Sequence, residues 1–396
     1  MARTLLLFFL ILHCSSTALV TCSGGGGGAA GLRMKLTHVD AKGNYTAPEL
    51  VRRAVAAGRQ RLAFLEASEA SGGGGGGRVE ALIDTGSDLI WTQCSTCLRK
   101  VCAKQTLPYY NSSASSSFKP VPCTDRMCAA NYYHFCDLDS GCSVIASYGA
   151  GTVIGSLATE VFAFQSGTAE LAFGCVTFTR IFPGALQGAS GLIGLGRGRL
   201  SLVSQTGANR FSYCLTRYFH NNGASGHLFV GAAASLITGH GDGAVTTIRF
   251  VKGPKGLPFY YLPLVGLTVG KTRLPIPSTL FDLRELAPGF TVGGVIIDSG
   301  SPFTRRRRRR DGPLRVEGDV GKVVPPLVFH FSGGADLAVP AENYWAPVGK
   351  ATACMAIGRG GRYSTVIGNF QQQNMHVLYD LADGELSFQP ADCSTL

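Results

Sequence analysis

Two short segments of the chain, residues 83–87 (IDTGS) and residues 297–301 (IDSGS), share one pattern. Each places an aspartate after an apolar run and follows it with a hydroxyl residue, a glycine and a second hydroxyl residue. An apolar strand that ends in a tight glycine turn presents its carboxylate at the strand end, with small hydrogen-bond donors beside it. If the fold brings Asp84 and Asp298 together, the two carboxylates can share one proton and carry out acid/base chemistry on an amide bond.

A weak internal repeat in the sequence supports the idea that the fold brings Asp84 and Asp298 together. An apolar-apolar-glycine unit ends 110 positions after Asp84, at residues 192–194, and a similar unit ends 70 positions after Asp298, at residues 366–368. Two lobes of one plan, each giving one aspartate to a shared cleft, account for this repetition. The second copy is shorter, in part because the first copy carries a cysteine-rich insert and in part, we expect, because segments have been lost.

The apolar pattern predicts the kind of fold that must position these residues. From Val79 onwards the apolar runs are short and are broken by glycine, serine and proline, and helical periodicity is scarce. The chain has 396 residues, which is enough for two domains. We therefore expect an all-β, bilobal fold with few short helices, made of residues 76–208 and 209–396.

The first 75 residues have a different character. Residues 1–23 carry a basic residue, a short apolar run and small residues, which is typical of a secretory signal peptide and too short to span a bilayer. Residues 24–75 hold a strand-like piece (33–39), a predicted basic amphipathic helix (48–67) and a glycine-rich break. We interpret this segment as a propeptide and linker that covers the acidic site; the alternative is an ordinary solvated helix. The protein is expected outside the cytosol, in the apoplast or the vacuole.

Thirteen cysteines fit a secreted protein. Two of them fall in the predicted signal peptide, and seven of the remaining eleven crowd between residues 94 and 142. The pair Cys94 and Cys97 has the spacing of a zinc site, but irregular spacings without interleaved histidines favour disulfides. Because eleven is odd, at least one thiol lacks a partner.

The formal charge of +11 raises the possibility of an acidic partner such as nucleic acid. Six of the positive charges are residues 305–310, an unbroken run of arginine without interleaved aromatic residues. Such a run is more typical of a solvated loop than of a nucleic-acid site, so no nucleic-acid partner is expected. The histidines are scattered without ligand spacing, and no metal or other cofactor is expected.

The chain resembles the pepsin-like aspartic proteases, and within them the plant nepenthesin-like branch. The resemblance covers about residues 33–396. Its most specific segments are 81–94 (ALIDTGSDLIWTQC), 211–215 (FSYCL), 297–301 and 366–373 (VIGNFQQQ), and residues 36–40 (LTHVD) look like the propeptide of that branch.

This resemblance implies a role for each residue of the two aspartate segments. Asp84 and Asp298 match the catalytic pair. The hydroxyl residue after each aspartate matches one that braces the two catalytic loops against each other, and the second hydroxyl residue matches one that hydrogen-bonds the carboxylate. The residues expected to support the dyad are Thr85, Gly86, Ser87, Ser299, Gly300 and Ser301.

The resemblance also implies a flap over the cleft. Tyr148 matches the flap tyrosine that closes over substrate, and Trp91 matches the tryptophan that hydrogen-bonds it. The branch usually has an aspartate where Ala150 stands, which is a minor departure at the flap tip.

Two further departures from the family are visible. The strand that normally precedes Val79 is replaced by a glycine run, and the helix and cysteine that normally follow Thr304 are replaced by the arginine run. The missing cysteine is the expected partner of Cys354, which should therefore be unpaired. The cysteines expected in disulfides, with Cys214 joined to Cys393, are Cys94, Cys97, Cys102, Cys123, Cys128, Cys136, Cys142, Cys175, Cys214 and Cys393.

The sequence thus predicts a secreted, monomeric aspartic endopeptidase that cleaves proteins or peptides with an acid pH optimum. The alternative is a catalytically impaired binding or inhibitor protein of the same fold, because the C-terminal lobe looks truncated around residues 305–320. Asn111, in the sequence Asn-Ser-Ser, is an expected glycosylation site.

Overall fold

The structure is a computed structural model, and it describes residues 31–38, 40, 45–46, 49–50, 64–67, 77–97, 101–131, 133–219, 224–236, 243–301, 304–306, 315–317, 323–347, 352–359 and 364–396. The predicted signal peptide lies outside the described residues, as do most of the predicted propeptide and residues 307–310 of the arginine run. The boundaries proposed from the sequence for these segments therefore stay predictions.

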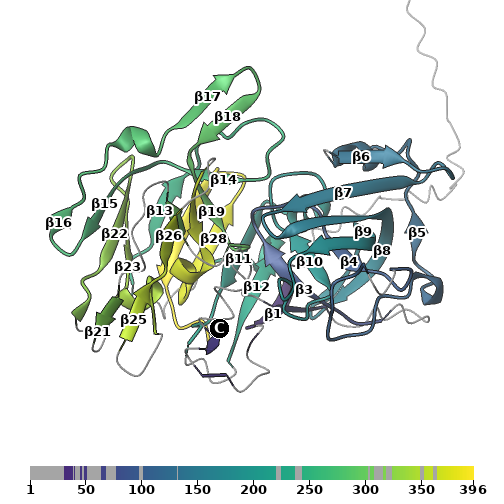
Figure 1. Cartoon of the computed structure of the whole chain (residues 1–396), viewed down its shortest axis with the longest axis horizontal. Helices are drawn as coiled ribbons and strands as arrows, with labels where there is room; N and C mark the ends of the chain where they lie inside the picture. Colours follow the sequence, from purple (N-terminus) through teal and green to yellow (C-terminus); the bar gives the residue numbers. More distant parts are fainter. Residues whose placement is uncertain are drawn as a thin grey trace, which may run out of the picture.

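The described residues form two β-rich lobes, which confirms the expected all-β, bilobal fold (Figure 1). One long path of hydrogen-bonded strands runs through both lobes, with β5 (Lys119–Pro120) attached to the side of β8. In order of pairing, the path holds β13 (Thr246–Arg249), β29 (Glu385–Pro390), β28 (Met375–Asp380), β11 (Arg210–Cys214), β12 (Ser225–Val230), β1 (Leu32–Thr37), β2 (Phe64–Ala67), β3 (Val79–Asp84), β10 (Gly191–Gly194), β4 (Trp91–Gln93), β9 (Gly167–Ile181), β8 (Gly151–Phe164), β7 (Cys142–Tyr148) and β6 (Tyr133–Cys136).

Smaller sheets complete the C-terminal lobe. In order of pairing they are β14 (Tyr260–Leu262), β19 (Val295–Asp298), β27 (Thr365–Gly368), β20 (Thr304–Arg306) and β26 (Ile357–Arg359); then β16 (Thr272–Arg273), β15 (Leu264–Val269), β22 (Leu327–Phe331) and β23 (Asp336–Val339); then β17 (Leu283–Ala287) with β18 (Phe290–Gly293); and β21 (Arg315–Glu317), β25 (Thr352–Met355) and β24 (Trp345–Pro347).

Helical structure in the described residues is limited to short pieces, as the sequence predicted. The helical elements with described bounds are α2 (Leu202–Gln205) and the 3₁₀ turns η2 (Ser112–Ala114), η3 (Cys128–Ala130), η4 (Gly231–Ala233), η5 (Ser278–Leu280), η6 (Ala341–Asn343) and η7 (Asn369–Gln372), and Asp40, Glu49, Leu50 and Val323 are also helical. None of the helices described is long and apolar enough to cross a membrane.

The burial of the strands follows their sequence patterns. All six residues of β3 are buried, which suits its largely apolar sequence VEALID and its place between two neighbouring strands. Strand β22 alternates buried and partly exposed residues, as expected for a strand with one covered face. The core extends through both lobes and is rich in aromatic side chains, among them Phe211, Tyr213, Tyr260 and Tyr379, none of which has exposed surface.

The strands that join the two lobes come from the segment interpreted as a propeptide. Strand β1 pairs with β12 over six residues and with β2 over two, and β2 pairs in turn with β3. Met34 of β1 has no exposed surface. The helix predicted over residues 48–67 is wrong at its end, because Phe64–Ala67 is strand β2: backbone pairing with β1 and β3 outweighs the local helical pattern. Among the other residues of that predicted helix, Glu49 and Leu50 are helical, and residues 51–63 lie outside the described part of the chain.

The start of the arginine run is also a strand and not a solvated loop. Strand β20 pairs in parallel with β26, where Thr304 lies opposite Ile357, and antiparallel with β27, where Arg305 lies opposite Val366. Hydrogen bonding on both sides therefore carries this charged segment into the sheet that contains β19, the strand that ends at Asp298.

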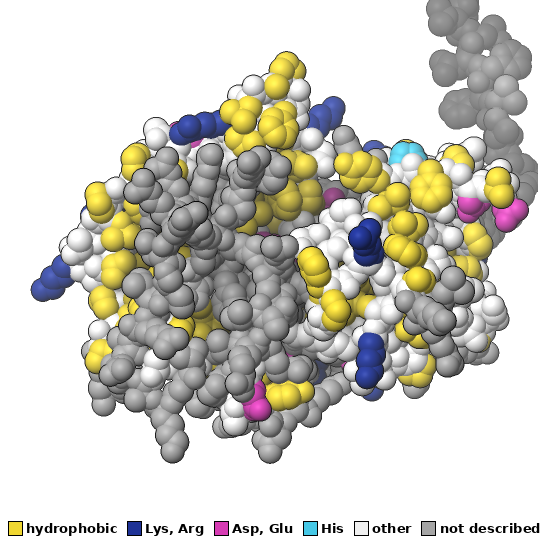
Figure 2. Space-filling model, in the orientation of Figure 1, with side chains coloured by type: hydrophobic (Ala, Val, Ile, Leu, Met, Phe, Trp, Pro, Cys, Tyr) yellow, Lys and Arg dark blue, Asp and Glu magenta, His cyan; other side chains and the backbone are white. Residues whose placement is uncertain are grey.

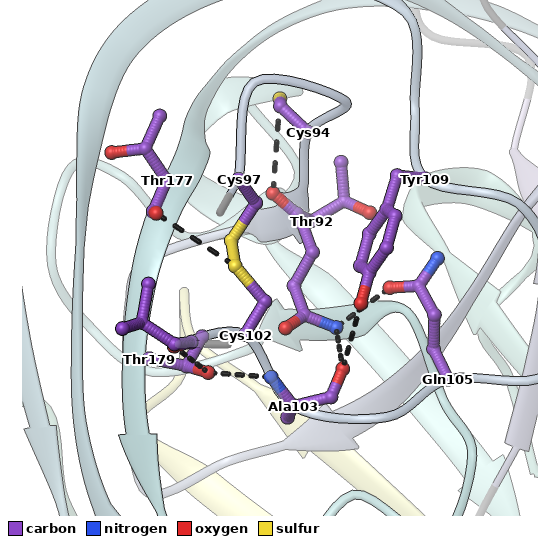
Figure 3. The surroundings of a disulfide bond; sticks show 11 residues. Thr92, Cys94, Cys97, Cys102, Ala103, Gln105, Tyr109, Thr177 and Thr179 are labelled. Atoms are coloured by element: carbon purple, nitrogen blue, oxygen red, sulfur yellow. Dashed lines mark hydrogen bonds between the residues drawn. A yellow bond between two sulfur atoms is a disulfide. The ribbon is translucent and has the colours of Figure 1, made fainter. Parts of the chain in front are cut away.

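Disulfides hold the cysteine-rich insert against the N-terminal lobe. The disulfide between Cys97 and Cys102 lies beside β9, where the Ala103 N–H donates to Thr179 Oγ1 at 2.7 Å (Figure 3). Cys354 is the free cysteine among the described residues, and the ten cysteines expected in disulfides are all paired. The pairs are Cys94–Cys175, Cys97–Cys102, Cys123–Cys136, Cys128–Cys142 and Cys214–Cys393.

The same lobe contains one buried carboxylate with a full set of donors. Glu160 of β8 is 1% exposed and accepts hydrogen bonds from the hydroxyls of Tyr110, Ser115 and Ser117 and from the Val161 N–H. Burial raises the pKa of Glu160, but these hydrogen bonds outweigh burial and leave the pKa below its usual value. The carboxylate is therefore a structural element of this lobe.

Candidate active site

The two aspartates lie at equivalent ends of two parallel strand pairs. Strand β3 pairs with β10, so that Asp84 lies opposite Gly194, and β19 pairs with β27, so that Asp298 lies opposite Gly368. The apolar-apolar-glycine units found in the sequence are the partner strands β10 and β27. Each lobe therefore delivers its aspartate in the same way, from the carboxyl end of a buried strand.

The structure brings these two carboxylates face to face, and the two glycines make the approach possible. A β-carbon on Gly300 would stand 2.0 Å from Asp84 Oδ1 and 3.0 Å from Asp298 Oδ1, and one on Gly86 would stand 2.8 Å from Asp298 Oδ1. No real side chain fits at such distances, so a larger residue at either position would force the loops apart. Because these two Oδ1 atoms lie 2.0 Å and 3.0 Å from one and the same point beside Gly300, they are at most 5.0 Å from each other. Asp84 is 2% exposed.

Each carboxylate is held by the same two donors from its own loop. The Gly86 N–H donates to Asp84 Oδ1 at 3.0 Å, and the Ser87 hydroxyl donates to Asp84 Oδ2. On the other side, the Gly300 N–H donates to Asp298 Oδ1 at 2.7 Å. The hydroxyl of the second serine in that loop, Ser301, donates to Asp298 Oδ2 at 2.6 Å. These bonds fix the orientation of both carboxylates, with Oδ1 of each, the inner oxygen, held by a glycine N–H and Oδ2 by a serine hydroxyl.

Two reciprocal hydrogen bonds brace the loops. The Thr85 N–H donates to Ser299 Oγ at 3.1 Å, and the Ser299 N–H donates to Thr85 Oγ1 at 2.9 Å. Neither residue has any exposed surface. Because both bonds are shielded from water, they couple the position of one loop directly to that of the other.

A β-hairpin made of β7 and β8 carries the predicted flap. Tyr148, the last residue of β7, accepts a hydrogen bond from Trp91 Nε1 at 2.8 Å. Trp91 is 1% exposed and sits on β4, beside β10, so its indole is a fixed support for the phenol. At the tip of the hairpin, the Ala150 carbonyl accepts from the Phe182 N–H at 3.0 Å, which joins the flap to the end of β9.

Sequence reasoning missed one residue of this region, Asp88. Its Oδ1 accepts from the Gly198 N–H at 2.7 Å. Burial raises the pKa of Asp88 to about 6; the Gly198 hydrogen bond opposes this rise, and the charge of Asp84 adds to it. The absence of side chains at Gly196 and Gly198 leaves space for the Asp88 carboxylate, because a β-carbon on either glycine would lie within 2.5 Å of a carboxylate oxygen. The only signal in the sequence was a third carboxylate directly after the first aspartate segment.

The other predicted sites lie apart from the dyad. No group of histidine, cysteine and acidic side chains that could hold a metal is found among the described residues. Asn111 is exposed at the start of η2, where its side chain accepts from the Ser113 N–H at 3.2 Å, and its glycosylation stays a prediction.

Comparison with known proteins relates the chain to plant proteinases. Two family models match, one described as xylanase inhibitor N-terminal over residues 71–232 and one described as xylanase inhibitor C-terminal over residues 313–390. The chain is 35% identical to aspartic proteinase nepenthesin-1 of Nepenthes gracilis, over 92% of this chain and 90% of that protein. It is 34% identical to aspartyl protease family protein 2 of Arabidopsis thaliana, over 80% of this chain and 68% of that protein. The alignment to nepenthesin-1 spans 410 positions, so that relative carries stretches that this chain lacks.

Solved structures support the fold. Basic 7S globulin from soybean matches with a TM-score of 0.65 at 14% identity, over 91% of this chain and 97% of that one. Conglutin gamma from lupine seeds matches with a TM-score of 0.62 at 15% identity, over 91% and 94% of the two chains. With the identity to the nepenthesins over most of both sequences, these findings place the protein in the plant branch of the pepsin-like aspartic protease family.

Proposed function

We propose that Asp84 and Asp298 are the catalytic pair of this aspartic endopeptidase and that it works at acid pH. The observation that supports this most strongly is the approach of the two carboxylates around Gly300, with matching donors on each side. Two ionised carboxylates this close repel each other, so the proposed reaction uses one proton shared by the pair.

The reaction needs that shared proton and one water molecule, which is held between the inner carboxylate oxygens of Asp84 and Asp298. The ionised carboxylate removes a proton from the water while the protonated carboxyl donates a hydrogen bond to the carbonyl of the scissile peptide. Attack gives a tetrahedral diol. Return of a proton to the amide nitrogen then breaks the C–N bond and releases an amine and a carboxylic acid, and the pair is again singly protonated. The braces between Thr85 and Ser299 keep the two carboxyls at the spacing that one water can bridge.

The substrate is a protein or peptide that lies as an extended chain between the lobes, under the flap that carries Tyr148. Hydrophobic side chains gather at the top of the molecule on the β17–β18 hairpin, where Leu286 and Phe290 are exposed (Figure 2). On the flap side, Phe182 is 58% exposed. These residues support a preference for substrates with apolar side chains. The enzyme is secreted and acts as a monomer without a nucleic-acid partner.

A binding protein of the same fold is the second candidate function. The descriptions of the two matching family models favour it, because both name a xylanase inhibitor. The geometry around Asp84 and Asp298 favours the protease, because a protein that only binds has no need of two matched carboxylate cradles.

One assay separates the two functions. Purified protein is incubated with an acid-unfolded protein substrate from pH 3 to pH 7, with and without pepstatin. In a parallel assay, the same protein is tested for inhibition of several xylanases. The proposal predicts pepstatin-sensitive cleavage that is fastest at acid pH. Absence of cleavage together with xylanase inhibition would establish the binding function instead.

A further inference from the structure

A glycine-rich segment, residues 194–198 (GLGRG), begins at the last residue of β10 and is bonded to the loop of the first aspartate. The Leu195 N–H donates to the Asp84 carbonyl at 2.8 Å, and the Gly196 N–H donates to the Ser87 carbonyl at 2.9 Å. Backbone atoms make both bonds, so the bonds do not depend on the charge of the carboxylate. Any shift of the segment therefore moves the backbone of Asp84.

The Leu195 carbonyl links the same segment to the second aspartate. It accepts from the Tyr260 hydroxyl at 2.8 Å, and Tyr260 lies on β14 directly opposite Ile297, the residue before Asp298. Among the described residues, no other group donates to this carbonyl. Leu195 thus bonds to the Asp84 backbone through its N–H and to the strand beside β19 through its oxygen.

Close packing holds the segment between these two sides. A β-carbon on Gly196 would lie 2.9 Å from the Ser87 carbonyl oxygen and 2.8 Å from Pro258 Cβ, so glycine at this position lets both sides approach. The next residue, Arg197, donates from its N–H to the Pro258 carbonyl at 3.0 Å. Its guanidinium lies over the Tyr260 ring, 5.7 Å from the ring centre. The segment is therefore fixed by backbone bonds and by contacts on both faces.

Asp88 holds the other end of the segment. Its Oδ1 accepts from the Gly198 N–H at 2.7 Å, and a β-carbon on Gly198 would lie 2.1 Å from its Oδ2. Because Asp88 directly follows Ser87, this carboxyl ties the end of the segment back to the loop that bears Asp84. The segment is thus bonded to that loop at both of its ends.

Tyr260 is a donor with a fixed position. It has no exposed surface, and its ring centre lies 4.8 Å from that of Tyr379 and 5.3 Å from that of Phe250. Burial raises the pKa of Tyr260, so the hydroxyl keeps its proton at acid and neutral pH. The phenol therefore has one proton to donate, and packing directs it to the Leu195 carbonyl.

We propose that segment 194–198 is a second brace of the catalytic pair, with Tyr260 and Asp88 as the positioning residues that hold its two ends. This inference rests on the proposed function of the dyad. The brace already described joins the two aspartate loops through the residue after each aspartate. The second brace reaches from the Asp84 backbone to the strand beside β19, so it sets the position of the first loop relative to the second catalytic strand.

The first test removes the Tyr260 hydroxyl and measures kcat and KM for a peptide substrate at acid pH. Tyr260→Phe keeps the packed ring but leaves the carbonyl of Leu195, a residue without exposed surface, lacking its donor. The segment and the Asp84 backbone should then shift. We expect kcat to fall about tenfold, because a displacement of about 1 Å can cost up to a hundredfold in rate. KM should stay within about twofold, because the Tyr260 hydroxyl is buried and does not reach the substrate.

The second test compares two substitutions of Asp88 at pH 4. Asp88→Ala removes the acceptor for the Gly198 N–H and should lower kcat about threefold. Asp88→Asn keeps an acceptor oxygen and should lose less of kcat than Asp88→Ala. The variant that combines Tyr260→Phe with Asp88→Ala should lose less than the product of the two single losses, because both residues act through one segment.

Tyr110→Phe is the matched control. It removes a buried hydroxyl that donates to Glu160 and not to segment 194–198. It should leave kcat unchanged at a temperature where all variants are folded by circular dichroism. A wild-type kcat in Tyr260→Phe, a change in KM alone, equal losses in the two Asp88 variants, or an equal loss in Tyr110→Phe would overturn the second brace and leave the protease assignment intact. Failure of the unmodified protein to cleave would overturn the proposed function, and this inference with it.

Discussion

The partly buried carboxyl of Asp88 should make the protein more stable in acid than at neutral pH. Its pKa is raised from 3.8 to about 6, mainly by burial. The unfolded chain releases this proton near pH 4, whereas the folded protein holds it up to about pH 6. The contribution of Asp88 to stability is therefore fully present below about pH 4, falls between pH 4 and pH 6, and is lost once the pH has passed about 6. A shift of about 2 pKa units is worth about 3 kcal/mol at 1.36 kcal/mol per unit, which is an upper value for a group that keeps some solvent contact.

Replacing the ionisable group tests this directly. Asp88→Asn keeps the oxygen that accepts from the Gly198 N–H and removes the titration. The free energy of unfolding is measured by urea titration at pH 4 and at pH 7.5 for the wild type, for Asp88→Asn and for Asp139→Asn, an exposed carboxyl. The wild type should lose about 2–3 kcal/mol relative to Asp88→Asn between the two pH values, and Asp139→Asn should follow the wild type. A difference between wild type and Asp88→Asn that does not change with pH would refute the reasoning.

The remaining predictions concern the insert, the flap and the joining strands. Glu160→Gln should lower the free energy of unfolding by about 1–3 kcal/mol at pH 6 and by less at pH 3. The lowered pKa of the Glu160 carboxyl gives stability that is lost as acid protonates it. An equal cost at both pH values would contradict this. Tyr148→Phe should lower kcat/KM by about tenfold with the fold unchanged, because the variant lacks the hydroxyl that accepts from Trp91. Unaltered kinetics would show that this hydrogen bond does not order the flap. A chain that begins at Gly77 lacks β1 and β2, and it should unfold at lower urea than the full chain; equal midpoints would show that the lobes do not need these strands.

The carboxylate cradles of the two aspartate segments could be predicted from the sequence because they are built from neighbouring residues. An apolar run, an aspartate, two hydroxyls and a glycine within five residues define both the strand end and the carboxylate cradle. The expected bracing by Thr85 and Ser299 depends on the two loops meeting, and the internal repeat was the signal for that meeting.

The features that sequence reasoning missed depend on contacts between distant parts of the chain. Burial of Asp88 depends on Gly198, 110 residues away. The hydroxyls of Tyr213 and Tyr379 lie 2.9 Å apart on neighbouring strands, although 166 residues separate them. Strand β2 was predicted as helix because its pairing with β3 lies outside the local pattern. In each case a tertiary contact, and not a local preference, decides the outcome.

The central claim is that Asp84 and Asp298 act as one unit on a single water. The most direct test is to measure single-turnover cleavage rates for Asp84→Asn, Asp298→Asn and the double variant, with Asp139→Asn as the control. Each single variant should be slower than the wild type by at least about a thousandfold, and the double variant should be no slower than the single ones, because removing either carboxyl already abolishes the shared proton. A single variant that cleaves at the wild-type rate, or losses that multiply in the double variant, would contradict the account.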